Sequence, residues 1–466
     1  MGIGAGRLRA VERHTATIPQ LRMDRMTKKL PYRWLVAFVL FFAYSIQYLD
    51  RVITTVLTPV LARDIGLTTS DIGTGTFLMM IFYGPAQLVT GGLTDKFGAK
   101  RLLLFSVVAW SLMAAWLGLI ESRMEYFYRM ALFGLLIGTE FVPSARVLMR
   151  WFNKEGRARA QALLSLAWIL TPAWASILAS QLALCFGDWR PVFFLTAAVG
   201  IVPLLLIQLF VFDRPEDYKH ITREELEHSY REELEAGILK GDDFRHARQQ
   251  IVAQRNFAFL DLFRNGSYLA VVLVVVVMQI TFWGALVWIP LYLSDTFSFK
   301  LDTMGYWNSV YYVAAAVGSF ASSYLSDKVF KNNRRVMIVV CFVGLIPFLL
   351  LLASLKTAAP AWLALALCGM GFFANMAWGP VLAVPAEIFT PEVYGKAMGL
   401  VNCCGYVAAA FAAKAFSAVV EVEDGTKDYT LGWLLIAACA AIGVVAACFI
   451  RTGAAAKPMS HATSSP

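Results

Sequence analysis

The chain has 466 residues, of which 58% are hydrophobic and only 16% are charged. Soluble domains average about 45–50% apolar and about 25% charged residues. The composition therefore excludes a string of soluble domains and favours a protein with many membrane-spanning helices. The net charge of +9 points to nucleic acid only if the basic residues do not gather on one side of the spans.

Residues 1–33 carry eight Lys and Arg residues and no apolar core. Without such a core, the segment does not fit a secretory signal peptide. We interpret it as a basic cytoplasmic tail, with an organelle transit peptide as the alternative.

Twelve apolar runs follow, each about as long as the 20 residues that a membrane-crossing helix needs. The first six lie at 34–61, 72–93, 102–120, 127–150, 160–184 and 191–212. The second six lie at 268–293, 304–325, 336–355, 361–386, 397–420 and 431–450. We predict an all-α membrane protein with a six-helix bundle at 34–212, a polar linker at 213–267, a second bundle at 268–450 and a tail at 451–466.

Basic residues segregate to alternate loops, which predicts the orientation of the spans. These loops hold Lys96, Lys100, Arg101, Arg150, Lys154, Arg157, Arg159, Lys328, Lys331, Arg334, Arg335 and Lys396. The opposite loops are acidic and include Asp64, Asp71, Glu121, Asp188, Asp295, Asp302, Glu421 and Asp428. Both termini and the linker should therefore face the cytoplasm, in a multi-pass protein of the inner or plasma membrane. The orientation of the spans also accounts for the positive net charge, so no nucleic-acid partner is needed to explain it.

The two halves share a repeat. Gly91–Arg101 reads GGLTDKFGAKR after the second span, and Ser323–Lys328 with a later Arg pair follows the eighth. Trp151–Ala162 also aligns without gaps with Ile388–Gly399. Six spans return each half to the same side, so the halves have parallel topology, which predicts a substrate site between them at mid-membrane.

The loop at 91–101 resembles the hallmark loop of the major facilitator superfamily. The stretch from Tyr48 to Arg101 resembles more specifically its anion:cation symporter family, through Tyr48-Leu49-Asp50-Arg51, Asp64-Ile65-Gly66-Leu67 and Tyr83-Gly84. That family contains galactonate-type sugar-acid/proton symporters, tartrate and phthalate permeases and vesicular glutamate carriers. The resemblance implies the major facilitator fold, with 12 transmembrane helices in two bundles related by a pseudo-two-fold axis.

Charged residues inside spans are the first candidates for a functional site, because each costs roughly 2.5–3.5 kcal/mol at the bilayer centre on insertion scales. The resemblance implies that Arg51 binds the substrate anion and that Asp50 takes up protons; the alternative is an ion pair that only packs helices. Neighbouring helical residues point about 100° apart, so a direct Asp50–Arg51 pair is poorly oriented. Glu140 is a second proton-coupling candidate. The family places its acid about one turn earlier, at Ile137 here.

Three further cations have open interpretations. Arg129 shares a helical stripe with Glu140 and either faces the same cavity or reaches the outer interface. Arg146 lies one turn from the cytoplasmic end, where we expect it to reach the interface. Lys414 is either a second substrate cation or a lipid-facing residue.

Polar and aromatic residues inside spans complete the expected substrate site. The resemblance assigns Tyr48 and Tyr83 to the cavity wall, and matches Asn375 and Trp378 to a polar-plus-Trp pair of the family. We expect Asn402, in the eleventh span, to supply an amide contact from the second half. Gln279 is a weaker candidate. Any one of them is otherwise a helix-packing or interface residue.

Asp95 with Arg101, and Asp327 with Arg334, occupy corresponding cytoplasmic loops. We expect them to act as gates that pair with a neighbouring helix and separate when the inside opens. The alternative is plain turn stabilisation.

We conclude that the chain is a secondary carrier, and not an enzyme, which moves a small organic anion with protons through the lipid bilayer. A sugar acid or related carboxylate is the expected substrate, and we expect no cofactor, no metal and a monomer. No Walker GxxxxGK[ST] or dinucleotide motif occurs. The alternatives are an organophosphate/phosphate antiporter, which commonly uses one Arg from each half, and a transporter-like sensor that binds ligand without flux.

Overall fold

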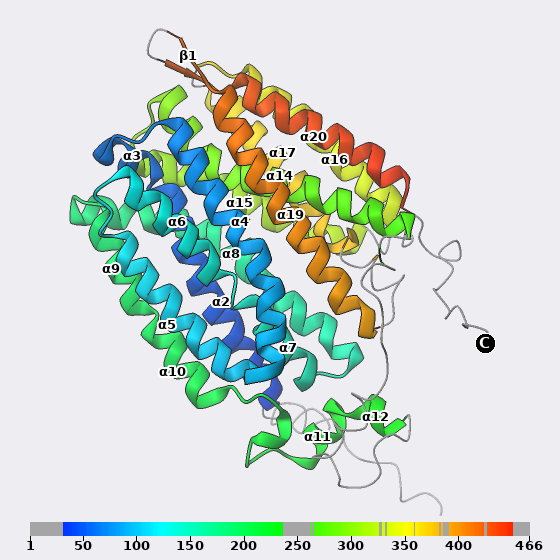
Figure 1. Cartoon of the computed structure of the whole chain (residues 1–466). Coiled ribbons are helices and arrows are strands. Elements are labelled where there is room, and N and C mark those ends of the chain that lie inside the picture. Colours follow the sequence, from blue (N-terminus) through cyan, green and yellow to red (C-terminus); the bar gives the residue numbers. More distant parts are fainter. Residues whose placement is uncertain are drawn as a thin grey trace, which may run out of the picture.

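The computed structural model describes residues 31–235, 262, 265–325, 329–330, 333–357, 359–381, 384, 391–423 and 426–450. Helices dominate these residues, as predicted (Figure 1). The described strands, β1 (Glu421–Glu423) and β2 (Thr426–Asp428), form one short antiparallel hairpin.

The first half contains α2 (Tyr32–Val56), α3 (Thr58–Ile65), α4 (Thr69–Phe97), α5 (Ala99–Leu117), α6 (Arg123–Ile137), α7 (Phe141–Trp151), α8 (Lys154–Phe186), α9 (Arg190–Val199) and α10 (Ile201–Phe210). Side chains at the helix starts explain several bounds. Thr68 and Asp71 form a capping box that begins α4, and Ser122 and Asn153 cap α6 and α8.

The linker begins with η1 (Pro215–Asp217), α11 (Arg223–Ser229) and α12 (Arg231–Glu235). The second half contains α14 (Gly266–Phe297), α15 (Leu301–Tyr324), α16 (Arg334–Ser354), α17 (Pro360–Met376), α19 (Pro391–Val419) and α20 (Thr430–Cys448).

Eleven helical segments of the described chain are long and apolar enough to cross a membrane. The predicted span at 304–325 corresponds to α15, which is not among them. This helix carries Asp302, Asn308 and several serines, and these lower its hydropathy. Three predicted spans are also interrupted: α2 ends at Val56, α6 ends at Ile137 and α9 ends at Val199.

Corresponding helices pack in the same way in both halves, which confirms the two pseudo-symmetric bundles. In the first half α2 packs on α8, α4 on α6, and α5 on α9; in the second, α14 packs on α19, α15 on α17, and α16 on α20. Glycines allow the close pairs. A Cβ on Gly134 would lie 1.9 Å from the Met79 carbonyl oxygen, and one on Gly371 would lie 2.2 Å from that of Tyr311. The bundles meet through α4 with α19 and α8 with α15.

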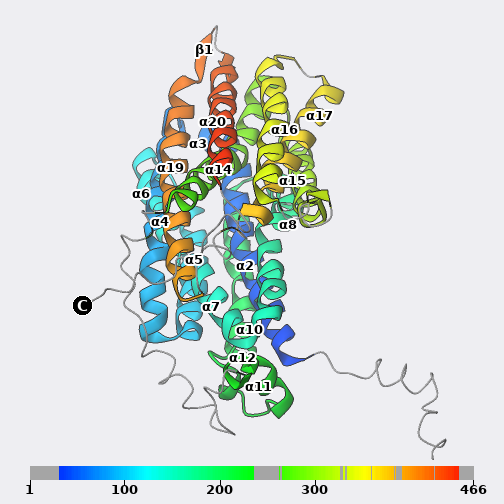
Figure 2. The same ribbon diagram turned by 90° about the vertical axis from the view of Figure 1, so that its right-hand side faces the viewer.

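The molecule is elongated, and its two ends are different (Figure 2). We call the end that carries the β1–β2 hairpin and α3 the hairpin end, and the opposite end, with α11 and α12, the linker end. Lys356 ties the hairpin to the second bundle through Asp428 (2.5 Å). Partial burial acts to raise the pKa of Asp428, but hydrogen bonds from Lys356 and Thr430 outweigh it and hold the pKa at about 2.

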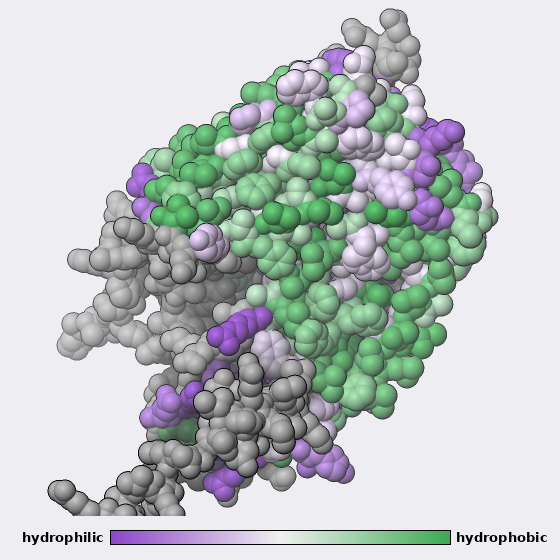
Figure 3. Space-filling model, turned by 180° about the vertical axis from the view of Figure 1, so that it is seen from behind, coloured by the Kyte–Doolittle hydropathy of each residue, from purple (hydrophilic) through white to green (hydrophobic). Residues whose placement is uncertain are grey.

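The surface has the character of a lipid-facing protein. Hydrophobic side chains cover most of the described surface in Figure 3, and hydrophilic ones gather near its edges. Large apolar residues such as Leu112, Leu209 and Val445 are exposed around the bundles. Because a soluble monomer rarely exposes so much contiguous apolar area, this surface fits a bilayer.

Candidate functional site

Arg51 lies inside the protein, with only 1% of its surface exposed. Its Nη2 donates hydrogen bonds to Gln47 Oε1 (3.0 Å) and to the Ile137 carbonyl oxygen (3.4 Å). Its Nε and Nη1 have no hydrogen-bond partner. The guanidinium is thus held in place through Nη2, while its Nε and Nη1 have N–H groups free to donate.

A break between α6 and α7 supplies the carbonyl that holds this edge. The α6 helix ends at Ile137, so the carbonyl of that residue lacks the usual intrahelical partner. It accepts instead from Gln47 Nε2 (2.8 Å) and Arg51. The sequence position where the resemblance places an acid therefore contacts Arg51 through its backbone.

Tyrosines surround the guanidinium. Its carbon lies 4.7 Å from the ring centre of Tyr48 and 4.5 Å from that of Tyr83, within cation–π range. Tyr44 and Tyr406 are also close enough to interact electrostatically. We call these four residues the tyrosine cage.

The second bundle contributes to this cage from α19, and other aromatic side chains extend it. Tyr406 meets Tyr83 edge to face, with centroids 4.3 Å apart, and Trp283 of α14 lies 6.1 Å beyond. Tyr312 of α15 lies near Tyr48. The hydroxyls of Tyr83 and Tyr312 and the indole nitrogen of Trp283 are buried without partners. Free donors from both bundles are therefore present around Arg51.

No carboxylate of the described chain forms a salt bridge with Arg51. Asp50 is fully buried and points instead toward α9, where the Thr196 hydroxyl approaches it. Glu140 is also fully buried, at the α6–α7 break, and is close enough to Asp50 and Arg51 to interact electrostatically. All four oxygens of these two carboxylates lack hydrogen-bond partners.

The amide candidates of the second half are placed less centrally. Asn375 is buried and donates to Tyr311 Oη (3.5 Å) and the Gly371 carbonyl oxygen (3.3 Å), inside its own bundle. Gln279 packs against Gly405 of α19. Asn402 and Trp378 are partly buried, and the Trp378 indole nitrogen has no partner.

Arg129 and Lys414 both lie away from the cage. Arg129 donates to the Trp116 carbonyl oxygen (2.6 Å) and to Glu125 (2.8 Å), toward the hairpin end of α6. Lys414 Nζ donates to the Ser70 carbonyl oxygen (3.2 Å), Ser70 Oγ (2.9 Å) and Thr74 Oγ1 (2.7 Å), all on α4.

The loop candidates that the structure describes lie toward the linker end. Asp95 forms an ion pair with Arg146 of α7, in the same bundle, whereas Arg101 is exposed. Arg334 begins α16, and Asp327 lies outside the described residues. Arg146, which we expected to reach the interface, is thus a partner of the loop acid.

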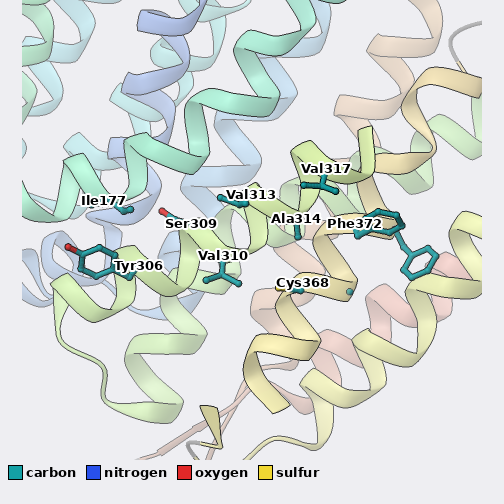
Figure 4. A pocket seen from close by; sticks show the side chains of 11 residues that line it. Ile177, Tyr306, Ser309, Val310, Val313, Ala314, Val317, Cys368 and Phe372 are labelled. Atoms are coloured by element: carbon teal, nitrogen blue, oxygen red, sulfur yellow. The ribbon is translucent and has the colours of Figure 1, made fainter. Parts of the chain in front are cut away.

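A separate groove of about 740 Å³ lies between α8, α15 and α17 (Figure 4). Apolar residues dominate its lining, including Val310, Val313 and Phe372, and none of the lining residues is charged. It contains no residue of the tyrosine cage, so it does not serve the guanidinium.

Helical spacing in the sequence could have identified some of the Arg51 neighbours that we did not assign. Gln47 precedes Arg51 by four residues, the spacing at which helical side chains meet. Tyr44 precedes Arg51 by seven residues, which also places it on the same helix face. Tyr312 and Tyr406 had no such signal pointing to Arg51, and the Ile137 carbonyl depends on a helix break.

The comparisons with known proteins agree with this architecture. The family model described as "Major Facilitator Superfamily" matches residues 40–413. The "Probable sulfoacetate transporter SauU" of Cupriavidus necator is 26% identical, covering 91% of this chain and 95% of the relative. The "Probable L-galactonate transporter" of Escherichia coli K12 is 24% identical, covering 93% and 92%.

Solved structures share the fold. A D-xylose-proton symporter superposes with a TM-score of 0.69 at 15% identity, covering 90% of this chain and 97% of that one. A bacterial homologue of the human lysosomal transporter Spinster gives a TM-score of 0.66 at 16% identity, covering 91% and 95%.

Proposed function

Because the chain belongs to the Major Facilitator Superfamily, and is therefore a multi-pass secondary transporter, we propose that it carries an organic anion in symport with protons. A sugar acid or a related carboxylate or sulfonate is the proposed substrate class. The names of the relatives cited above support an organic acid, and the buried guanidinium of Arg51 supports an anion.

The observation that carries the proposal is the buried guanidinium of Arg51, which has no carboxylate partner among the residues that the structure describes. A buried charge without a counter-ion has a desolvation penalty of several kcal/mol. An arriving carboxylate supplies that counter-ion, and the free N–H groups of Nε and Nη1 can donate charge-assisted hydrogen bonds to it. The free hydroxyls of Tyr83 and Tyr312 extend this donor set to the remaining oxygens of the anion.

Proton coupling is proposed through Asp50 and Glu140, whose oxygens are free to take up protons. Glu140 interacts electrostatically with Arg51. An anion bound at Arg51 offsets the positive charge that favours ionised Glu140, so the anion and a proton on Glu140 favour each other. That mutual preference is what symport requires.

The proposed orientation places the linker end in the cytoplasm, with both termini on that side. Basic loop residues at this end, including Arg101 and Arg150, support it. The Asp95–Arg146 pair is the proposed inner gate of the first bundle. It would separate when the inside opens.

An organophosphate antiporter is the less favoured alternative. Such a carrier would need a second cation facing Arg51, and α14 contains neither Arg nor Lys. The ammonium of Lys414 is occupied by α4.

Uptake by proteoliposomes tests the proposal, with labelled galactonate, glucarate and sulfoacetate as probes. We expect Arg51→Gln to lower kcat/KM at least about 100-fold and Arg51→Lys to restore little, because Lys lacks the planar fork. Arg223→Gln, on the exposed helix α11, is the matched control and should leave uptake unchanged. Undiminished uptake by Arg51→Gln would contradict the proposed site. Binding of a probe without accumulation would favour the sensor.

A further inference from the structure

We propose that Lys414 is a latch that holds the two bundles together at the hairpin end, and so sets the balance between the closed and open states of that end. This role differs from substrate binding and does not depend on the identity of the anion.

The first support is the set of hydrogen bonds that Lys414 makes. An ammonium group has three N–H donors, and the Ser70 carbonyl, Ser70 hydroxyl and Thr74 hydroxyl provide three acceptors at 2.7–3.2 Å. Lys414 belongs to α19 of the second bundle, and both partners belong to the first turns of α4. All three hydrogen bonds therefore cross from one bundle to the other.

The second support is the tight packing on either side of the latch. A Cβ on Gly73 would lie 2.1 Å from Ser417 Oγ and 2.4 Å from its Cβ. Phe77 and Phe411 meet edge to face with centroids 5.3 Å apart. Helical spacing places these contacts along one stripe of α4, so α19 follows this stripe closely.

Other helices of the two bundles are also in close contact at this end. A Cβ on Gly305 of α15 would lie 2.2 Å from Ser180 Oγ of α8, and Asn308 Nδ2 donates to Ser176 Oγ (2.9 Å). Arg63 of α3 donates to Ser294 Oγ of α14 (2.9 Å). The hairpin end is thus shut in this structure.

Opening this end requires α4 and α19 to separate, which breaks all three hydrogen bonds of Lys414 together. Hydrogen bonds to a charged group are stronger than neutral ones. The latch therefore favours the closed state, and its loss shifts the equilibrium toward opening. A contact at the hairpin end whose partners both belong to one bundle makes no such difference, because opening this end does not separate them.

The chain offers a matched control for this experiment. Lys356 is another lysine at the hairpin end, bonded to Asp428 (2.5 Å) and Thr430 (2.6 Å), but its partners belong to the same bundle. Lys356→Met therefore removes a similar contact without affecting the contact between bundles.

The experiment measures the distance between the bundles without any substrate. Spin labels are placed on cysteines introduced at Glu121 and Ala361, which are exposed and belong to different bundles, after replacement of the seven native cysteines. We expect Lys414→Met to raise the ratio of long to short distances about tenfold, and Lys356→Met to leave it unchanged. Ser70→Ala with Thr74→Val should shift the ratio in the same direction.

Combining the variants separates a latch from an unrelated effect. If Lys414 acts through Ser70 and Thr74, then adding their substitutions to Lys414→Met should change nothing further. Additive shifts, or an unchanged distance in Lys414→Met, would overturn the latch. An unchanged distance with a KM raised tenfold or more would overturn it in favour of a second substrate cation. Because the distances need no ligand, they remain informative even if Arg51 binds no anion.

Discussion

Position 51 places a permanently charged side chain among tyrosine rings, the Gln47 amide and the Ile137 carbonyl oxygen, none of which carries a negative charge to neutralise it. The geometry explains why the neighbouring acid does not do so. Adjacent helical residues diverge by about 100°, and Asp50 accordingly faces α9 while Arg51 faces the tyrosine cage. The two residues can therefore serve different partners, a proton and an anion, although they are neighbours in the chain.

At the same scale, Glu140→Gln should separate proton coupling from anion binding. We expect uptake driven by an inward pH gradient to fall at least about tenfold, because the amide cannot take up the coupled proton. Exchange of external for internal labelled anion, which needs no net proton movement, should stay within about twofold. Glu121→Gln, at an exposed carboxylate of the hairpin end, should affect neither. Equal loss of both activities would show that Glu140 binds the anion or supports the fold.

The sequence could identify residues whose chemistry is unusual for a bilayer. Asp50, Arg51 and Glu140 were predictable because charge inside a span is costly. Lys414 was equally conspicuous, but its interpretation stayed open because its partner Ser70 is 344 residues away. Tyr406 could not be assigned either, since a tyrosine inside a span is unremarkable and the approach of α19 to α4 decides its role.

At the scale of elements, three interruptions of predicted spans have a common local cause. The helix after each interruption has a proline in its first turn: Pro59 in α3, Pro143 in α7 and Pro203 in α10. Proline cannot donate to the carbonyl four residues earlier, and its ring crowds that carbonyl. Prolines elsewhere, such as Pro85 and Pro290, leave α4 and α14 continuous. Apolar length therefore predicted the spans but not which of them would break.

Gly73→Ala tests whether α4 and α19 need their close approach. The added Cβ meets both the hydroxyl and the Cβ of Ser417, so one helix must move away. We expect a loss of about 1–3 kcal/mol in stability, typical of overpacking, seen as a lower melting temperature in detergent. Ser417→Gly should restore much of it. Gly91→Ala on the same helix meets nothing within 4 Å and should be neutral or slightly stabilising. Equal melting temperatures for the two alanine variants would refute this close contact.

At the scale of the whole molecule, the repeat in the sequence predicted two bundles of parallel topology, and the matching helix pairs confirm them. The repeat could not predict the asymmetry between them. The first bundle supplies the central cation, while the second supplies Tyr406, Tyr312 and Trp283 around it. A repeat in the sequence locates the axis between the bundles, but the side chains that face it have diverged.

Because both bundles contribute residues around Arg51, we can predict how a bound anion stabilises the protein. A ligand in the tyrosine cage contacts both bundles, so it should raise the melting temperature of the whole chain in one transition. At 100 times its Kd, a ligand adds about 2.7 kcal/mol to stability. Tyr406→Ala, in the bundle without the central cation, should at least halve the shift produced by the best of galactonate, glucarate and sulfoacetate. Tyr306→Ala, in the surface groove, should leave the shift intact. A full shift in Tyr406→Ala would mean that the first bundle holds the anion alone, and that closure of the second bundle follows binding without contributing to it.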